Sequence, residues 1–197
     1  MNNLNLRDAS EVDVPIIAEL VYATEDDPQH EWGEGSKEEI IDRISYLMIV
    51  TGSRYYYKNI KVAELDSKAC GTIILLKSDD IPRLDITTKI KLIMTIKGVI
   101  RKIKFIKDII LASSLDEYDE HEIYVANLAT SEEVWGKGIG KSLMILAEKM
   151  AKEQGYKRCS LLAKDESLIN FYSKLDYKLE KEERYFSHNL YRMVKIV

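Results

Sequence analysis

The chain has 197 residues, of which 46% are hydrophobic and 31% charged, a composition typical of a folded protein that can bury a core. The net charge of -4 provides no overall basic field, so nucleic-acid binding is not expected. No basic segment followed by an apolar stretch opens the chain, and no window reaches the roughly 18 apolar residues of a membrane span. We expect one cytoplasmic domain over residues 1–197, without a membrane partner.

The cysteines and histidines predict neither disulfides nor a metal site. Cys70 and Cys159 lie far apart in apolar runs, which indicates buried, reduced thiols. His30, His121 and His188 have no spacing that suits metal ligands, so no metal is expected.

The first third of the chain predicts a strand, two helices and a hairpin. A strand over 4–7 precedes a helix from about residue 11, and Pro and Gly indicate a loop over 26–35. Ser36 and Glu39 form a capping box that opens the second helix. Apolar runs at 60–65 and 70–77 flank a short polar link, which is typical of an antiparallel hairpin.

Residues 80–118 form an insertion with a basic, helical pattern. Between Lys89 and Leu111 lie seven basic residues and one acid, and isoleucines recur at steps of three and four. Gly98 divides this segment into two helices. The pattern is compatible with a lid over a cleft, with binding to an anionic surface, or with packing on the domain or a second subunit. The wide apolar stripe favours packing and leaves a homodimer open.

The last third predicts the remaining elements of an α/β (α+β) fold. A strand over 123–129 leads through a glycine turn to a helix over 140–154, capped by Gly155. A strand over 159–163 and a helix over 165–175 follow. Two strands then surround Ser187-His188-Asn189.

The glycine turn, residues 136–142 (GKGIGKS), carries the chemistry. Its glycines allow a tight turn and a close approach to a ligand. It lies between a strand and a helix, where free N–H groups and the helix dipole suit a pyrophosphate. A Walker loop would need glycine at Trp135, and a dinucleotide fingerprint would need glycine at Lys141, so both fail by spacing.

The turn and its surroundings resemble the GNAT family of N-acetyltransferases. Its signature R/Q-x-x-G-x-G/A corresponds to residues 135–140 (WGKGIG), with Trp135 in place of Arg or Gln. Residues 170–177 (NFYSKLDY) are similar to the family's F-Y-x-K-L-G-F segment. The resemblance implies a mixed, mostly antiparallel sheet of about seven strands flanked by helices, with a helical insertion between strands 3 and 4.

The resemblance also implies acetyl-CoA as co-substrate. The residues expected to bind acetyl-CoA lie at the end of the fourth strand, in the glycine turn and at the start of the following helix. One further residue is an aspartate at a position where the family has asparagine. These are Leu128, Ala129, Thr130, Trp135, Gly136, Lys137, Gly138, Ile139, Gly140, Lys141, Ser142 and Asp165.

Tyr172 matches the family tyrosine that protonates the departing thiolate. The resemblance implies transfer of an acetyl group to a primary amine of a small molecule or peptide, by direct attack in a ternary complex. The base is not visible: Asn127 cannot usefully accept a proton, Glu122 and Tyr124 lie nearby, and deprotonation of the amine by bulk water is an equal alternative. The acidic loop residues Asp26, Asp27, Glu31 and Glu34 would suit a cationic acceptor. A non-catalytic module that binds acyl-CoA or a partner is the alternative.

Overall fold

The computed structural model describes residues 4–112, 115, 117–185 and 188–197. In that part of the chain seven strands form one sheet in the order β1-β2-β3-β4-β5-β7-β6. All neighbours are antiparallel except β4 and β5, which are parallel. The strands are β1 Leu4–Asp8, β2 Ile60–Leu65, β3 Lys68–Lys77, β4 Ile123–Thr130, β5 Arg158–Ala163, β6 Lys178–Tyr185 and β7 His188–Ile196. The predicted sheet is confirmed.

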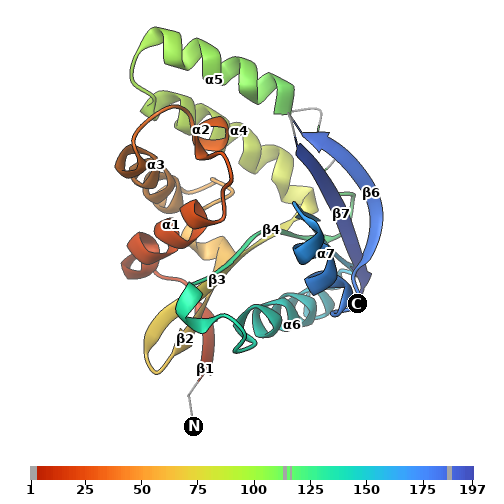
Figure 1. Cartoon of the computed structure of the whole chain (residues 1–197). Helices are drawn as coiled ribbons and strands as arrows, with labels where there is room; N and C mark the ends of the chain where they lie inside the picture. Colours follow the sequence, from red (N-terminus) through yellow and green to blue (C-terminus); the bar gives the residue numbers. More distant parts are fainter. Residues whose placement is uncertain (1–3, 113–114, 116, 186–187) are drawn as a thin grey trace.

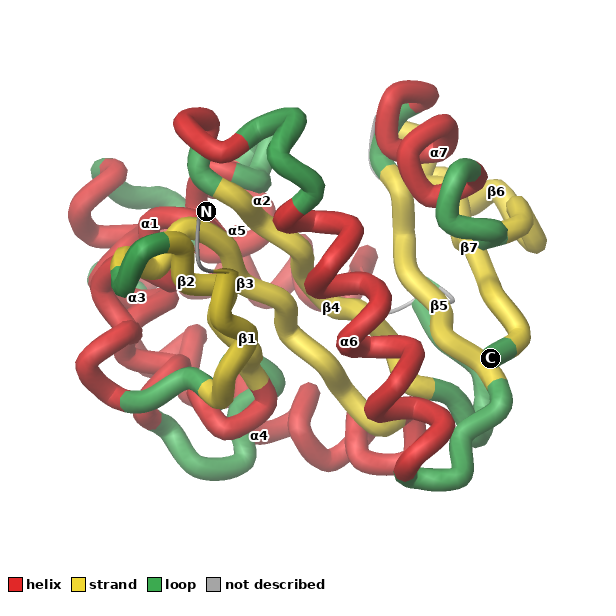
Figure 2. The backbone as a smooth tube through the Cα atoms, turned by 90° about the horizontal axis from the view of Figure 1, so that it is seen from below, coloured by secondary structure: helices red, strands yellow, loops and turns green. Residues whose placement is uncertain are grey.

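Helices cover both faces of the sheet, each over its own apolar core (Figures 1 and 2). Helices α1, α3 and α4 pack over one face, where Val21, Ile44 and Ile74 are buried. Helices α6 and α7 pack over the other face, where Leu143 and Leu161 are buried. The helices are α1 Val14–Ala23, α2 Pro28–Trp32, α3 Lys37–Ile49, α4 Ile81–Thr95, α5 Val99–Ala112, α6 Ile139–Glu153 and α7 Glu166–Ser173.

Local sequence signals set several of these boundaries as predicted. The capping box at α3 is present: Glu39 N–H donates to Ser36 Oγ (3.3 Å), and Ser36 N–H donates to Glu39 Oε2 (3.1 Å). Asp66 and Ser67 adopt φ of 51° and 66°, the left-handed pair that a two-residue hairpin turn requires. Gly155 follows α6 with φ of 82°.

Two predictions need correction. Residues 28–32 of the expected loop 26–35 form α2, since Pro28 suits the first turn of a helix. The packing of the insertion's isoleucines on the domain is also wrong for most of them, while packing on a second subunit stays a prediction. Ile96 is buried and Ile93 partly buried, but the rest are exposed, namely Ile90, Ile100, Ile103, Ile106 and Ile110. Ser187 of the final predicted turn lies outside the described residues.

The insertion forms a helical hairpin between β3 and β4. Gly98, with φ of 89°, separates α4 from α5. Figure 1 shows α5 as the outermost element on its side, beyond α4 and α2. None of the helices in the described part of the chain has the length and apolar character needed to span a bilayer.

The sheet is interrupted between β4 and β5, which pair only near their first residues. Ile123, Tyr124 and Val125 face Cys159, Ser160 and Leu161 in register, and no pairing follows. In β4 the pairing to β3 skips Ala126, a bulge that bends the strand. From there β4 follows β3, while β5 continues with β7, so the two strands diverge.

A buried ion pair closes the paired end. Glu122 is fully buried and accepts hydrogen bonds from Arg192 Nη2 (2.7 Å), from the backbone N–H of Asp119 (2.9 Å) and from the Ser160 hydroxyl. Arg192 is also buried. The pair, with the Ser160 hydroxyl, joins the start of β4 to β5 and β7 at the end where β4 and β5 are paired.

We predict that Glu122→Ala lowers the free energy of unfolding by about 3 kcal/mol, because it removes the fully buried carboxylate partner of Arg192 and leaves this buried arginine with the more exposed Asp119 and Glu180. Glu180 contacts the same arginine but is more exposed, so Glu180→Ala should cost about 1 kcal/mol or less. Urea unfolding of the two variants measures the difference. Equal costs would contradict a closing role for Glu122.

Candidate active site

The glycine turn presents free backbone donors at the start of α6. A short 3-10 turn over Glu132–Val134 leads from β4 into it. Gly136 and Gly138 adopt φ of 76° and 78°, which only glycine takes without strain. The first hydrogen bond of α6 runs from Ser142 N–H to Gly138 O (3.0 Å). The N–H groups of residues 139–141 precede that bond, so they lack a partner within the helix and can cradle an anion.

Trp135 plays a different part from the Arg or Gln that the signature expects. Its side chain is 65% exposed, and its indole N–H donates to Thr130 O (3.2 Å). The side chain therefore links the turn back to the end of β4 and adds no positive charge. The cradle rests on backbone groups, with Lys137 and Lys141 exposed on either side of Ile139.

The divergence of β4 and β5 leaves the backbone of residues 128–130 paired on one side only. Leu128, Ala129 and Thr130 pair with β3, and none of them pairs with β5. A Cβ built on Gly140 would lie 3.5 Å from Phe171 and 4.0 Å from Leu128. The start of α6, the end of β4 and α7 therefore meet around the opening. The predicted cofactor residues of the turn and of β4 lie together there.

Helix α7 contributes Tyr172 to this side of the sheet. The side chain is buried and contacts Phe171 and Tyr177, with ring centroids 5.0 and 6.0 Å away. Burial, reinforced by the carboxylate of Asp165, raises the pKa of the Tyr172 phenol above its usual value. The hydroxyl therefore stays protonated at neutral pH, as a proton donor must. Asp165 itself caps α7 by accepting the Leu168 N–H (2.8 Å).

The turn after α1 lies across the opening from the other face. Asn127 of β4 donates to the hydroxyl of Thr24 (2.9 Å). Lys164, directly after β5, donates to Thr24 O (2.8 Å) and to Asp26 (2.6 Å). One short turn thus binds Asn127 within β4 and Lys164 directly after β5. Glu25 lies between its two anchored residues.

Glu25 is the functional candidate that sequence reasoning missed. Burial raises its pKa to about 8, the repulsion of Glu31 adds to the shift, and Lys164 opposes it. Trp32 and Tyr55 also interact electrostatically with the same carboxyl group. Asn127 Oδ1, just beneath the turn, is buried without a hydrogen-bond partner among the described residues. In the sequence Glu25 is one of several acids in a row, and nothing there reveals which of them is partly buried.

Glu122 and Tyr124, the two candidates for the base named from the sequence, are engaged in other contacts. Glu122 forms an ion pair with Arg192 at the end where β4 and β5 are still paired. Tyr124 is buried against Tyr118 and Arg54.

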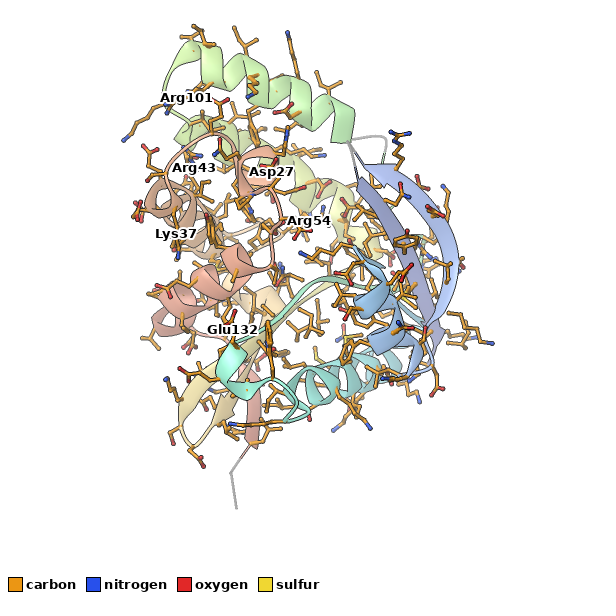
Figure 3. All side chains as sticks on the ribbon, in the orientation of Figure 1. Asp27, Lys37, Arg43, Arg54, Arg101 and Glu132 are labelled. Carbon is orange, nitrogen blue, oxygen red and sulfur yellow. The ribbon has the colours of Figure 1, made fainter. Side chains whose placement is uncertain are left out.

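Two acids of the loop expected at the acceptor side, Glu34 and Asp26, have cationic partners, and the insertion supplies those of Glu34. Glu34 pairs with Lys104 and lies 3.9 Å from Arg101, while His30 lies 3.8 Å from Asp108. Asp26 pairs with Lys164. Figure 3 places Asp27 beside α2 and Arg101 at the start of α5. Both residues line a hollow of about 310 Å³.

A smaller hollow of about 110 Å³ lies deeper, beside Glu31, Trp32 and Tyr55. Arg54 lines its wall and is held by Asp85 (3.1 Å) and Glu117 (2.6 Å). Figure 3 shows Arg54 near the middle of the molecule. Trp32 and Tyr55, which line this hollow, also interact with Glu25 of the turn after α1.

Comparisons with known proteins agree with this geometry. The sequence profile of the acetyltransferase (GNAT) family matches residues 17–177, and the chain belongs to this family of N-acetyltransferases. An N-acetyltransferase from Staphylococcus aureus Mu50 is 20% identical, with a TM-score of 0.79 over 97% of this chain and 100% of that one. A second acetyltransferase structure is 22% identical, with a TM-score of 0.72 over 98% and 99%.

A third similar structure contains coenzyme A. It is the PaiA N-acetyltransferase from Thermoplasma acidophilum, which is 18% identical, with a TM-score of 0.57 over 99% of each chain. A search of curated protein sequences found no match.

We predict that Glu25→Gln stabilises the protein at high pH. The folded protein holds this proton up to about pH 8, whereas the unfolded chain releases it near pH 4.5, so the stability contributed by this group falls as pH rises between those values. Above pH 8 the variant should melt about 2–4 °C higher than the native protein, the shift that 1 kcal/mol produces in a domain of this size.

Below about pH 5 the difference in Tm should vanish, because glutamine then replaces a protonated, uncharged carboxyl group. Glu19→Gln, on the exposed side of α1, is the matched control and should show no pH-dependent gain. A Glu25→Gln variant that melts with the native protein at every pH would rule out a buried carboxyl with a raised pKa.

Proposed function

We propose that the protein transfers an acetyl group from acetyl-CoA to a primary amine of a small molecule or peptide, by direct attack in a ternary complex. The observation that carries this proposal is the opening between β4 and β5. It has the free donors of α6 and the phenol of Tyr172 on one face of the sheet, and Glu25 with Asn127 on the other. Two reactants that enter from opposite faces would meet there.

The residues present fit acetyl-CoA, which supplies an activated acetyl thioester when it binds. The N–H groups of Ile139, Gly140 and Lys141 would hold the pyrophosphate at the N-terminus of α6, where the helix dipole favours an anion. The free edge of residues 128–130 would pair with the amide groups of the pantetheine arm. Trp135 keeps the turn against β4, and Gly136 and Gly138 allow its shape.

Further predicted cofactor residues would act around this cradle. Lys137 and Lys141 are exposed cations that would favour phosphate, and Ser142 donates its hydroxyl to Gly138 O (3.1 Å), which stabilises the first turn of α6. Asp165 would act through its cap on α7, since this cap fixes the helix that carries Tyr172.

Two residues of this chain would handle the protons. The raised pKa of Tyr172 keeps the phenol protonated until the thiolate departs, and its Oη would then donate the proton. A carboxylate at Glu25 would accept a proton from the amine, and a pKa of about 8 makes it a better base than an exposed glutamate. Asn127 Oδ1, which lacks a partner among the described residues, would accept a second N–H from the same amine.

The acceptor side favours a positively charged amine. Glu25 and Glu31 lie close enough to repel one another, and Lys164 is the only cation that acts on Glu25 among its main influences. A cationic ligand beside these carboxylates would relieve that repulsion. The small volume of the deeper hollow, about 110 Å³, admits an alkylamine chain rather than a bulky ring system.

Thiol release from acetyl-CoA on a panel of amines tests the proposal. Tyr172→Phe keeps the ring contacts and removes only the hydroxyl, so kcat should fall about 10²–10⁴-fold while acetyl-CoA still binds. Glu25→Gln should lower kcat/KM and remove an inflection near pH 8 from its pH profile. Tyr46→Phe, in α3, is the control and should leave turnover unchanged.

Cofactor binding without turnover on any amine would contradict the proposal and favour a non-catalytic acyl-CoA-binding module. Full activity in Tyr172→Phe would exclude that residue as the proton donor.

A further inference from the structure

The outer face of α5 is apolar and open to solvent. It consists of the side chains of Val99, Ile100, Ile103, Ile106 and Ile110, all of which are exposed. Ile100 keeps 84% and Ile110 68% of its surface exposed. Most surface helices turn only polar residues outward, whereas α5 is apolar on its outer face as well as on its inner side. A row of exposed isoleucines along one helix marks an interaction surface, unlike single exposed apolar residues.

The inner side of α5 already packs on the domain. A rotation of the helix that buried the outer face would break these contacts. Phe105 is buried and lies close to Gly33, where an added Cβ would stand 3.5 Å from the ring. Lys104 pairs with Glu34 on the same loop. These contacts hold α5 with its isoleucines outward, and Figure 1 shows no other element beyond it.

Every charged residue beside the outer face is positive. Lys97, Lys102 and Lys107 have no ion-pair partner in the part of the chain that the structure describes. Lys107 follows Ile103 by four residues and precedes Ile110 by three, so it lies within the apolar row. The acid of α5, Asp108, is partly buried near His30, on the side toward α2. Apolar and cationic groups are therefore mixed on one surface without acids.

We propose that the outer face of α5 binds the surface of a membrane that contains anionic lipids. Isoleucines can enter the boundary between headgroups and acyl chains, while lysines extend their long side chains to the phosphates. The helix is about 21 Å long, too short for the hydrocarbon core of about 30 Å, so it lies in the plane of the surface. This placement does not depend on the acetyl transfer proposed above.

Charge favours this occupant over a second copy of the chain. Two outer faces packed together would bring the lysines of one copy against those of the other. A lysine in the middle of an apolar protein interface would also need an acidic partner, whereas a lipid phosphate supplies one wherever the helix lands.

Co-sedimentation with vesicles tests the proposal on the full chain. Vesicles of phosphatidylcholine mixed with phosphatidylglycerol should carry the protein down at low salt, and pure phosphatidylcholine should not. Ile100→Glu and Ile110→Glu should each weaken binding about tenfold, because each places a carboxylate against the lipids at a highly exposed site that folding does not need. Lys107→Gln should weaken it about fivefold.

Ile145→Glu is the matched control, since Ile145 is 51% exposed on α6 and should leave sedimentation unchanged. Absence of sedimentation at low salt, or equal binding to both kinds of vesicle, would overturn the proposal. So would a dimer in light scattering that Ile100→Glu disrupts without any vesicle binding, because the face would then belong to a second copy. Acetyl transfer to a soluble amine is measured on the same variants. Unchanged transfer with weakened vesicle binding shows that the substitution acts on membrane binding and not on the enzyme activity.

Discussion

The separation of β4 from β5 is the constraint on which the rest of this structure depends. The two parallel strands share three residues of pairing and then diverge, and a bulge in β4 at Ala126 follows directly after the last pair. A sheet that lost more pairing would lose its integrity, and the buried pair of Glu122 and Arg192 prevents this by joining β4 to β7 at the closed end. The opening is thus a fixed feature of the sheet.

Everything assigned to catalysis lies around that opening, and much of it costs stability. Gly136 and Gly138 adopt backbone conformations that other residues avoid, and the N–H groups at the start of α6 have no partner within the helix. Glu25 is held next to Glu31 with a raised pKa, and Asn127 Oδ1 lacks a partner among the described residues. Unsatisfied groups on both faces of one opening indicate ligands on both faces.

Short sequence patterns predicted most of the fold, because each of them determines the backbone geometry of its own few residues. The capping box of Ser36 and Glu39, the left-handed turn at Asp66 and Ser67, and the glycines of the turn before α6 each encode their own geometry. The spacing of that turn and the tyrosine helix also led to the family and to Tyr172.

The acceptor side could not be predicted in the same way, since it depends on contacts distant in sequence. Glu25 acquires its raised pKa from a turn that Asn127 and Lys164 hold, more than 100 residues away. Glu122 resembled a base by its place before β4, yet Arg192 neutralises it. The isoleucines of α5 have the period of a packed helix, and that period does not say which side faces the protein.

Amide hydrogen exchange with and without acetyl-CoA tests the central claim most directly. If the opening is the binding site, saturating acetyl-CoA should slow exchange in residues 128–130 and 139–141, and leave α5 unchanged. Gly138→Glu, which forces a side chain onto a left-handed residue at the cradle, should abolish that protection. Protection confined to the hollows beside α2 and α5, with residues 128–130 unchanged, would contradict the account.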